Sequence, residues 1–309
     1  MIFWVIIGLA AAVTAFLIAP ALLIFVAVFH HKKTVPFEEY NWEKFKDHYY
    51  VPYLGRIERE RDFVWSHPKK EVYADAYDGV KLYGEYYDLG KKRTAILFHG
   101  FNAEIYTNLS AHGAFLINHG FNVLFAVHRA HSKSGGKWSG IGLREQNDVL
   151  SWAKWAEESG AEEILIYGVS MGASAAAFAS DRLGSTKVCA MVCDSGFYSV
   201  YEQMKRDTKK MHIPGIMLPA QKLLAKVFLK LDLEKPVTDS LKNSSVPVLF
   251  IHGTEDETVP CKWGKLNFEA CAEPKQLLLV DGAPHTLSIL YNETLTGETL
   301  EAFIDKYFA

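Results

Sequence analysis

Short apolar runs alternate with longer segments of helical pattern from Glu71 onward, and this alternation leaves few folds open. The apolar runs are Thr94–Gly100, Phe121–Val127, Ile164–Gly168, Lys187–Asp194, Val246–Gly253 and Lys275–Gly282. Each has the length of a buried strand, and segments of helical spacing such as Leu143–Ser159 separate them. Strands joined through helices predict an α/β fold, in which a mostly parallel sheet is covered by helices on both faces.

The carboxyl ends of these strands are where functional residues are expected, because ligands bind at that edge of a parallel sheet. Ahead of the first parallel strand, two alternating runs flank Asp78-Gly79, which predicts an antiparallel hairpin. A final helix is expected near Tyr291–Phe308. We therefore expect one folded domain over residues 71–309.

Residues Ile2 to Phe29 contain no charged side chain. A helix of that length, at ~1.5 Å per residue, exceeds a hydrocarbon core of about 30 Å, and Pro20 is expected to kink it. A preceding basic residue and a small-residue cleavage site are both missing, which favours a retained anchor over a cleaved signal peptide. The sequence thus predicts a transmembrane anchor over residues 1–30 and a single-pass protein of the cell membrane.

The segment that follows is predicted to be a juxtamembrane connector over residues 31–70. Lys32 and Lys33 come directly after the apolar run, and the positive-inside rule then places the folded domain on the cytoplasmic side. Its aromatic residues are expected either to lie at a bilayer interface or to pack on the domain; they are Tyr40, Trp42, Tyr49, Tyr50 and Tyr53.

Charge and cysteine content narrow the classes of partner. A net charge of −3 and a pI near 6.5 give no basic footprint for nucleic acid. The four cysteines lack metal-site spacing and are interpreted as core thiols, with disulfides left open. No metal or organic cofactor is expected, and the oligomeric state is left open.

Ser170 is the first candidate for chemistry. It stands in a G-x-S-x-G frame, between an apolar strand and a run of small residues suited to a helix. This context predicts a nucleophile elbow, in which the serine sits on a strained turn from strand to helix. The N–H of Met171, at the helix start, is then placed to stabilise an oxyanion.

A serine nucleophile needs a base and an acid that orients the base. Of the twelve histidines, His285 follows the last predicted strand, which fits the chain order serine, acid, histidine better than His99, His112, His119 or His252. The acid is expected in the loop after the preceding strand. That loop offers Glu255, Asp256 and Glu257, and their residue types alone do not choose among them.

A second oxyanion donor is expected in the loop after Thr94–Gly100. A backbone N–H does this work, so the identity of the side chain matters little. Phe101 is the better placed, with Asn102 as the alternative.

From about Glu71, these motifs together resemble the α/β-hydrolase superfamily, and in particular membrane-anchored bacterial esterase-like members related to serine aminopeptidase-type hydrolases. The matching segments are ILFHGF, HRAHSKSGG, EQND, GVSMG, FIHGTEDETVP and DGAPH, in the family's order over roughly three quarters of the chain. The family's acid precedes x-x-Val-Pro, which selects Asp256. By the same resemblance Ser170 and His285 complete the triad. This chain departs from the family pattern at Val127 and Ser132, where Asp and Gly are common, and the departure bears on the conformation of that loop rather than on the chemistry.

A cap is implied over about residues 198–245, where the family carries one. AQKLLAKVFLKL within it places Lys222, Lys226 and Lys230 on one side of a helix, and Leu223, Leu224, Val227, Phe228 and Leu231 on the other. The helix is interpreted either as a cap that packs this apolar stripe over the site or as a basic amphipathic helix that rests on anionic lipid. Both interpretations favour an apolar acyl substrate.

The resemblance implies a serine hydrolase that cleaves a carboxylic ester, its substrate a small-molecule ester or a lipid-like molecule. Two alternatives stay open: a membrane-tethered serine peptidase or amidase, and a non-catalytic binding protein on the same fold.

Overall fold

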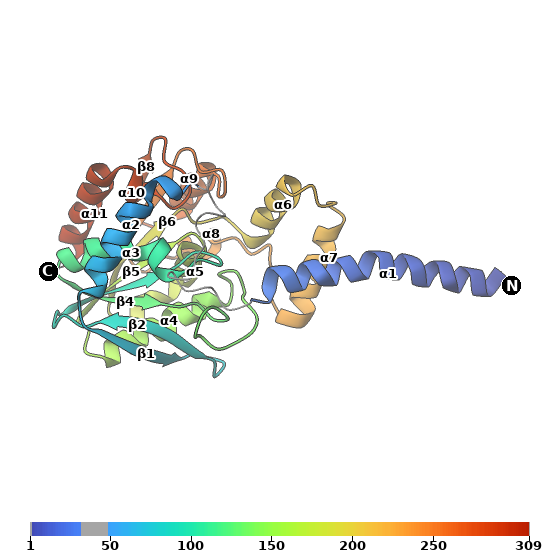
Figure 1. The fold of residues 1–309 in the computed structure, drawn as a ribbon, viewed down its shortest axis with the longest axis horizontal. Helices are drawn as coiled ribbons and strands as arrows, with labels where there is room; N and C mark the ends of the chain where they lie inside the picture. Colours follow the sequence, from blue (N-terminus) through green and yellow to red (C-terminus); the bar gives the residue numbers. More distant parts are fainter. Residues whose placement is uncertain (1, 32–48, 309) are drawn as a thin grey trace.

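The computed structural model describes residues 2–31 and 49–308 (Figure 1). Lys32 and Lys33, on which the predicted orientation rested, lie outside the described residues, as do Tyr40, Trp42 and most of the predicted connector. Tyr49, Tyr50 and Tyr53 are described, and they pack against the folded domain.

A single sheet of eight strands, counted over the described residues, has the order β1-β2-β4-β3-β5-β6-β7-β8. The strands are β1 (Lys69–Asp75), β2 (Lys81–Tyr87), β3 (Arg93–Phe98), β4 (Phe121–Ala126), β5 (Glu163–Val169), β6 (Val188–Asp194), β7 (Val248–Gly253) and β8 (Lys275–Val280). β1 and β2 form the predicted antiparallel hairpin, and β2 pairs antiparallel with β4. The remaining strands pair in parallel, in the order β4-β3-β5-β6-β7-β8. The predicted mostly parallel sheet is confirmed, with strand ends shifted by a residue or two.

Helices cover both faces of this sheet. One face carries α2 (Leu54–Trp65), α3 (Ile105–Asn118), α10 (Ser288–Tyr291) and α11 (Glu293–Tyr307); the other carries α4 (Glu145–Glu158), α5 (Met171–Ala179), α8 (Thr238–Leu241) and α9 (Cys261–Ala270). Successive strand residues point to opposite faces, so Ile96 of β3 joins the core beside α4 and α5 while Leu97 joins the core beside α3. Burial on both faces explains why these strands are continuously apolar in sequence.

The described residues also include short 3₁₀- and π-helical segments. They are η3 (Val51–Tyr53) and η4 (Ser180–Ser185), both 3₁₀, and η5 (Ala225–Leu229), which is a π-helix. The four cysteines all lie within the described residues and are free thiols; Cys193 and Cys271 are buried.

The predicted membrane anchor is wrong. Within residues 2–31 and 49–308, none of the helices combines the length and apolar character needed to cross a bilayer. The single-pass anchor over residues 1–30, the cell-membrane localisation with a cytoplasmic domain, and the membrane as a partner of the N-terminal helix are withdrawn with it. The apolar run does form a helix, α1 (Ile2–Phe29), but Ala21, Phe25 and Phe29 are buried against other parts of the chain.

The cap consists of α6 (Val200–Lys210), α7 (Met217–Leu224) and η5, and Figure 1 shows it beside the C-terminal part of α1. The helical segment with the predicted apolar stripe buries a different face from the predicted one. Leu231 is buried and Leu224 is half-buried, but Leu223, Val227 and Phe228 are exposed. The buried face is formed instead by Leu218, Gln221, Ala225 and Leu229. The π-helix of η5 shifts the side chains after Ala225 around the axis, which a pattern of regular helical spacing does not anticipate.

Candidate active site

Ser170 stands at the turn between β5 and α5 with φ 54° and ψ −113°, a backbone conformation that is strained for a residue other than glycine. Its backbone N–H donates to the carbonyl of Asp194 at 2.8 Å. The glycine at 172 is required by close approach, because a Cβ there would lie 2.2 Å from the carbonyl oxygen of Phe98. The residues that frame the serine thus let α5 begin directly against β3 and present the Ser170 hydroxyl at the strand end.

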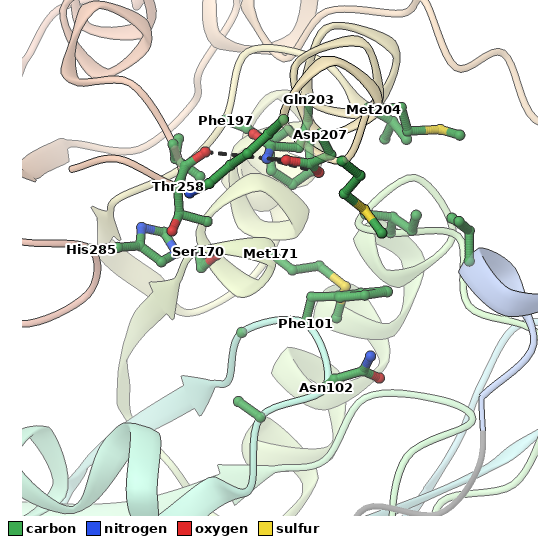
Figure 2. A pocket seen from close by; sticks show the side chains of 18 of the residues that line it. Phe101, Asn102, Ser170, Met171, Phe197, Gln203, Met204, Asp207, Thr258 and His285 are labelled. Carbon is green, nitrogen blue, oxygen red and sulfur yellow. Dashed lines mark hydrogen bonds between the residues drawn. The ribbon is translucent and has the colours of Figure 1, made fainter. Parts of the chain in front are cut away.

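The loop after β8 brings His285 to this serine. The Ser170 Oγ lies 3.0 Å from Nε2 of His285, and Figure 2 shows these two side chains next to each other. Nδ1 of the same ring lies 2.6 Å from Oδ2 of Asp256. With the carboxylate ionised, the Nδ1–H donates to it and Nε2 is left to accept the serine proton. The three residues predicted from sequence are therefore brought together in one hydrogen-bonded series.

Asp256 is held in the loop after β7 by its own backbone. Its Oδ1 accepts from the N–H groups of Thr258 at 2.9 Å and Val259 at 2.7 Å, which leaves Oδ2 for His285. The side chain is buried, at 6% exposure, whereas Glu255 and Glu257 are exposed. Burial raises the pKa of Asp256, but hydrogen bonds with His252 and His285 outweigh it and lower that pKa to about 2. The carboxylate is accordingly charged throughout the neutral range.

The two predicted oxyanion donors come from different elements beside the serine, α5 and the loop after β3. Met171 is the first residue of α5, where backbone N–H groups have no partner within the helix. Phe101 follows β3 and lines the same pocket as Ser170. The alternative, Asn102, points its N–H at Nε2 of His131, 3.4 Å away. The Phe101 N–H therefore remains the candidate oxyanion donor in the loop after β3.

No family model matches the chain. Among curated proteins, YqkD of Bacillus subtilis is 28% identical over 69% of this chain and 71% of its own length. The α/β hydrolase domain-containing protein 17B of Xenopus tropicalis is 28% identical over 60% of this chain, and the chain spans 57% of that protein's length. Among solved structures, the Pyrococcus furiosus esterase Pf2001 superposes with a TM-score of 0.70 at 22% identity, over 91% of this chain and 99% of the esterase.

The chain has the α/β-hydrolase fold. The three hydrogen-bonded residues lie where strands of this hydrolase fold end, on the loops after β5, β7 and β8. The same edge also carries the loop after β3 with Phe101. The described part of the chain holds no cluster of three or more His, Cys, Asp or Glu side chains suited to a metal ion.

Sequence reasoning missed a second partner of Asp256. His252 is buried at the end of β7, and its Nε2 lies 2.9 Å from the carbonyl of Val259 and 3.3 Å from Oδ2 of Asp256. Since both neighbours accept, Nε2 of His252 carries the proton. The only sequence signal was its place just before Gly253, four residues ahead of Asp256, and His99 also precedes a glycine at a strand end.

A chain of hydrogen bonds joins the loop after β3 to the loop after β8, and it too was missed. The Gly100 N–H donates to Oδ1 of Asn108 at 2.7 Å, and Nδ2 of Asn108 donates to the Tyr50 hydroxyl at 2.9 Å. The Tyr50 hydroxyl lies 2.6 Å from Oγ1 of Thr286, which donates to the carbonyl of His285 at 2.6 Å. Tyr50, Asn108 and Thr286 are buried, so the bonds are shielded from water.

The loop that departs from the family pattern is anchored by a buried arginine. Arg129 donates from Nε to Asp148 at 2.7 Å and from Nη1 to Asp78 at 2.7 Å. Ser134 donates to the carbonyl of Val127 at 2.8 Å. Val127 and Ser132 are thus accommodated in a loop that its neighbours hold by side-chain and backbone bonds.

A pocket of about 750 Å³ opens over Ser170. Ser170, His285 and Phe101 line it from the sheet side (Figure 2), and Met204 of α6 and Leu218 of α7 line it from the cap. The volume falls within the range of about 300–1,000 Å³ that small-molecule sites occupy. Most of its exposed lining surface is apolar, and its polar groups lie around the serine, at the start of α3 and on the cap.

Proposed function

We propose that this chain is a serine hydrolase that cleaves a carboxylic ester through an acyl-enzyme. The observation that carries the proposal is the pair of distances at His285, 3.0 Å to Ser170 Oγ and 2.6 Å to Asp256 Oδ2, at the floor of an apolar pocket. The fold neighbours include the Pyrococcus furiosus esterase and an Exiguobacterium antarcticum esterase, which supports hydrolysis of an ester.

In the proposed mechanism, Ser170 Oγ attacks the ester carbonyl carbon as its proton passes to Nε2 of His285. Asp256 stabilises the imidazolium that forms and keeps the ring in place. The N–H groups of Met171 and Phe101 hold the negative oxygen of the tetrahedral intermediate. His285 then gives its proton to the leaving alcohol, and the acyl group stays on Ser170. Water, deprotonated by His285, releases the carboxylic acid by the same steps in reverse.

Labelling by a fluorophosphonate tests the nucleophile. The reagent phosphonylates an activated serine with loss of fluoride, so the wild type should be labelled and Ser170→Ala should not. Ser185→Ala is the matched control, since Ser185 is exposed and outside the pocket. Failure to label folded wild-type protein, or equal labelling of Ser170→Ala, would reject the proposal.

A comparison of p-nitrophenyl esters with p-nitroanilides of the same acyl groups tests the bond that is cleaved. The ester proposal expects turnover of the esters and at least a hundredfold lower kcat/KM for the anilides. Comparable turnover of anilides would identify a serine amidase instead.

A further inference from the structure

The C-terminal part of α1 forms one side of the pocket that contains the candidate nucleophile. Ile24, Ala27 and Val28 line the same pocket as Ser170 and His285. Residues spaced by three and four positions lie on one face of a helix, so a single face of α1 is turned to the pocket. Figure 2 shows the ribbon of α1, in blue, at the edge of this pocket.

Side chains on the adjoining face of α1 fix the helix in place. Phe25 and Phe29 are buried, and the ring of Phe25 lies 5.5 Å from that of Trp138. Gln221 of α7 donates from Nε2 to the carbonyl of Ala21 at 2.8 Å. α1 is therefore packed against both the cap and the loop around Trp138.

Backbone hydrogen bonds secure the end of α1 as well. The Ser139 N–H donates to the carbonyl of Phe29 at 2.9 Å, and the His31 N–H donates to the carbonyl of Lys137 at 3.2 Å. These two bonds flank a β-bridge between His30 and Trp138. The face that carries Ile24 and Val28 is consequently held at the pocket by bonds on both sides of Trp138.

The cap contributes mainly apolar groups to the same pocket. Met204 of α6 and Met217 and Leu218 of α7 line it, and thioether side chains adapt to chains of different shape. Two polar residues of α6 that line it bond to each other, since Nε2 of Gln203 donates to Asp207 at 2.9 Å; Thr208 and Lys210 line it as well. An unbranched alkyl chain would find apolar contacts on α1 and on the cap at once.

We propose that α1 forms part of the acyl-binding subsite, and that the substrate is an ester of a medium or long unbranched fatty acid. The inference rests on the proposed function of Ser170, because the chain must reach the pocket as the acyl part of an ester. Burial of one methylene corresponds to about a fourfold gain in kcat/KM. The wild type should accordingly prefer p-nitrophenyl octanoate over the butyrate by at least tenfold.

Ile24→Trp and Val28→Trp test the subsite. A tryptophan at either position fills space that the distal carbons of the acyl chain would occupy. We expect the ratio of kcat/KM for octanoate over butyrate to fall at least tenfold in each variant. Leu23→Trp is the matched control, because Leu23 is 71% exposed on the same helix and outside the pocket.

Thermal unfolding of each variant shows whether the tryptophan only fills the pocket or also displaces α1 and lowers the stability. Val28→Ala is a further variant, which adds no bulk. Val28→Ala should weaken octanoate turnover relative to butyrate by a few-fold. An octanoate-to-butyrate ratio equal to wild type in all three pocket variants would overturn the inference while labelling still upheld the nucleophile.

Binding of a fluorescent fatty acid to the Ser170→Ala protein gives a readout that does not need catalysis. We expect Val28→Trp to weaken this binding at least tenfold in the Ser170→Ala background and Leu23→Trp to leave it unchanged. Equal binding by the Val28→Trp and Leu23→Trp variants of the Ser170→Ala protein would reject the α1 subsite whether or not the chain is a hydrolase.

Discussion

The two oxygens of the Asp256 carboxylate have different partners, and this difference fixes the histidine. Oδ1 accepts from two backbone N–H groups of its own loop, whereas Oδ2 faces the rings of His285 and His252. The carboxylate cannot rotate without breaking bonds to both sets of partners. The His285 ring is thereby held with Nε2 toward Ser170.

Asp256 should also link stability to pH. Its pKa of about 2 lies below the value near 3.9 for an unfolded chain, so the ionised carboxylate stabilises the folded state above about pH 4. This stabilisation, on the order of 2 kcal/mol, should be lost as the pH falls from about 4 to 2. In Asp256→Asn, the free energy of unfolding from urea titrations should vary less with pH over that interval.

The same variant should lose most of its ester turnover, because the His285 tautomer is no longer enforced. Glu257→Gln, on an exposed neighbour, is the control and should keep both the activity and the pH slope. An Asp256→Asn protein whose pH slope equals that of the wild type would contradict the assigned pKa.

At the level of single residues, the sequence predicted the candidate site residues that a local sequence pattern identifies. Ser170 could be found because strand, turn and helix are contiguous in sequence, and Asp256 because a family pattern ties it to Val259-Pro260. His252 and Asn108 could not be found in that way. The role of Asn108 depends on its bond to Tyr50, which is distant in sequence and is brought close only by the fold. His252 lies near Asp256 in sequence, but no local pattern indicates their contact.

At the scale of elements, α3 connects two loops of the site through Asn108. Asn108→Ala would leave the buried Gly100 N–H without its acceptor and separate Tyr50 from the oxyanion loop. Since a small misplacement of a catalytic group can cost a hundredfold, kcat on p-nitrophenyl butyrate should fall about 10–100-fold with little change in KM.

Asn243→Ala is the matched control for that substitution, because Asn243 is exposed on the segment after α8 and outside the pocket. Thermal unfolding of both variants should be followed alongside the kinetics. Wild-type kcat in a folded Asn108→Ala protein would show that the hydrogen-bond chain does not position the site.

The cap and α1 were the elements that sequence reasoning described least well. An apolar helical surface can contact lipid, pack on another helix or line a pocket, and its composition does not tell these environments apart. The strands were predicted more closely because a short apolar run bounded by helices has few alternatives in a parallel sheet. The exposed Leu223, Val227 and Phe228 and the π-helix of η5 illustrate the difference.

For the whole molecule, Arg129 joins three distant parts of the domain. It is 1% exposed and bonds to Asp148 of α4 and to Asp78 in the hairpin turn between β1 and β2. Removing one partner of a buried ion pair typically costs about 3–5 kcal/mol, since the other charge is left buried. Arg129→Met should lower the free energy of urea unfolding by about that amount.

Replacing Asp148 as well should recover part of the loss, so Arg129→Met with Asp148→Leu is expected to be more stable than Arg129→Met alone. Lys92→Met removes an exposed partner of Glu162 and should change stability by less than about 1 kcal/mol. A single Arg129→Met variant as stable as Lys92→Met would contradict the assigned role.

The packing of α1 on the cap also has a consequence for synthesis of the protein. Ala21 and its partner Gln221 are 200 positions apart. At a translation rate of about 5–20 residues per second, α1 would wait roughly 10–40 s after it is made before that partner is translated. During this interval an apolar helix has no native surface to cover it, so the nascent chain should be a ready client for chaperones that bind exposed apolar segments.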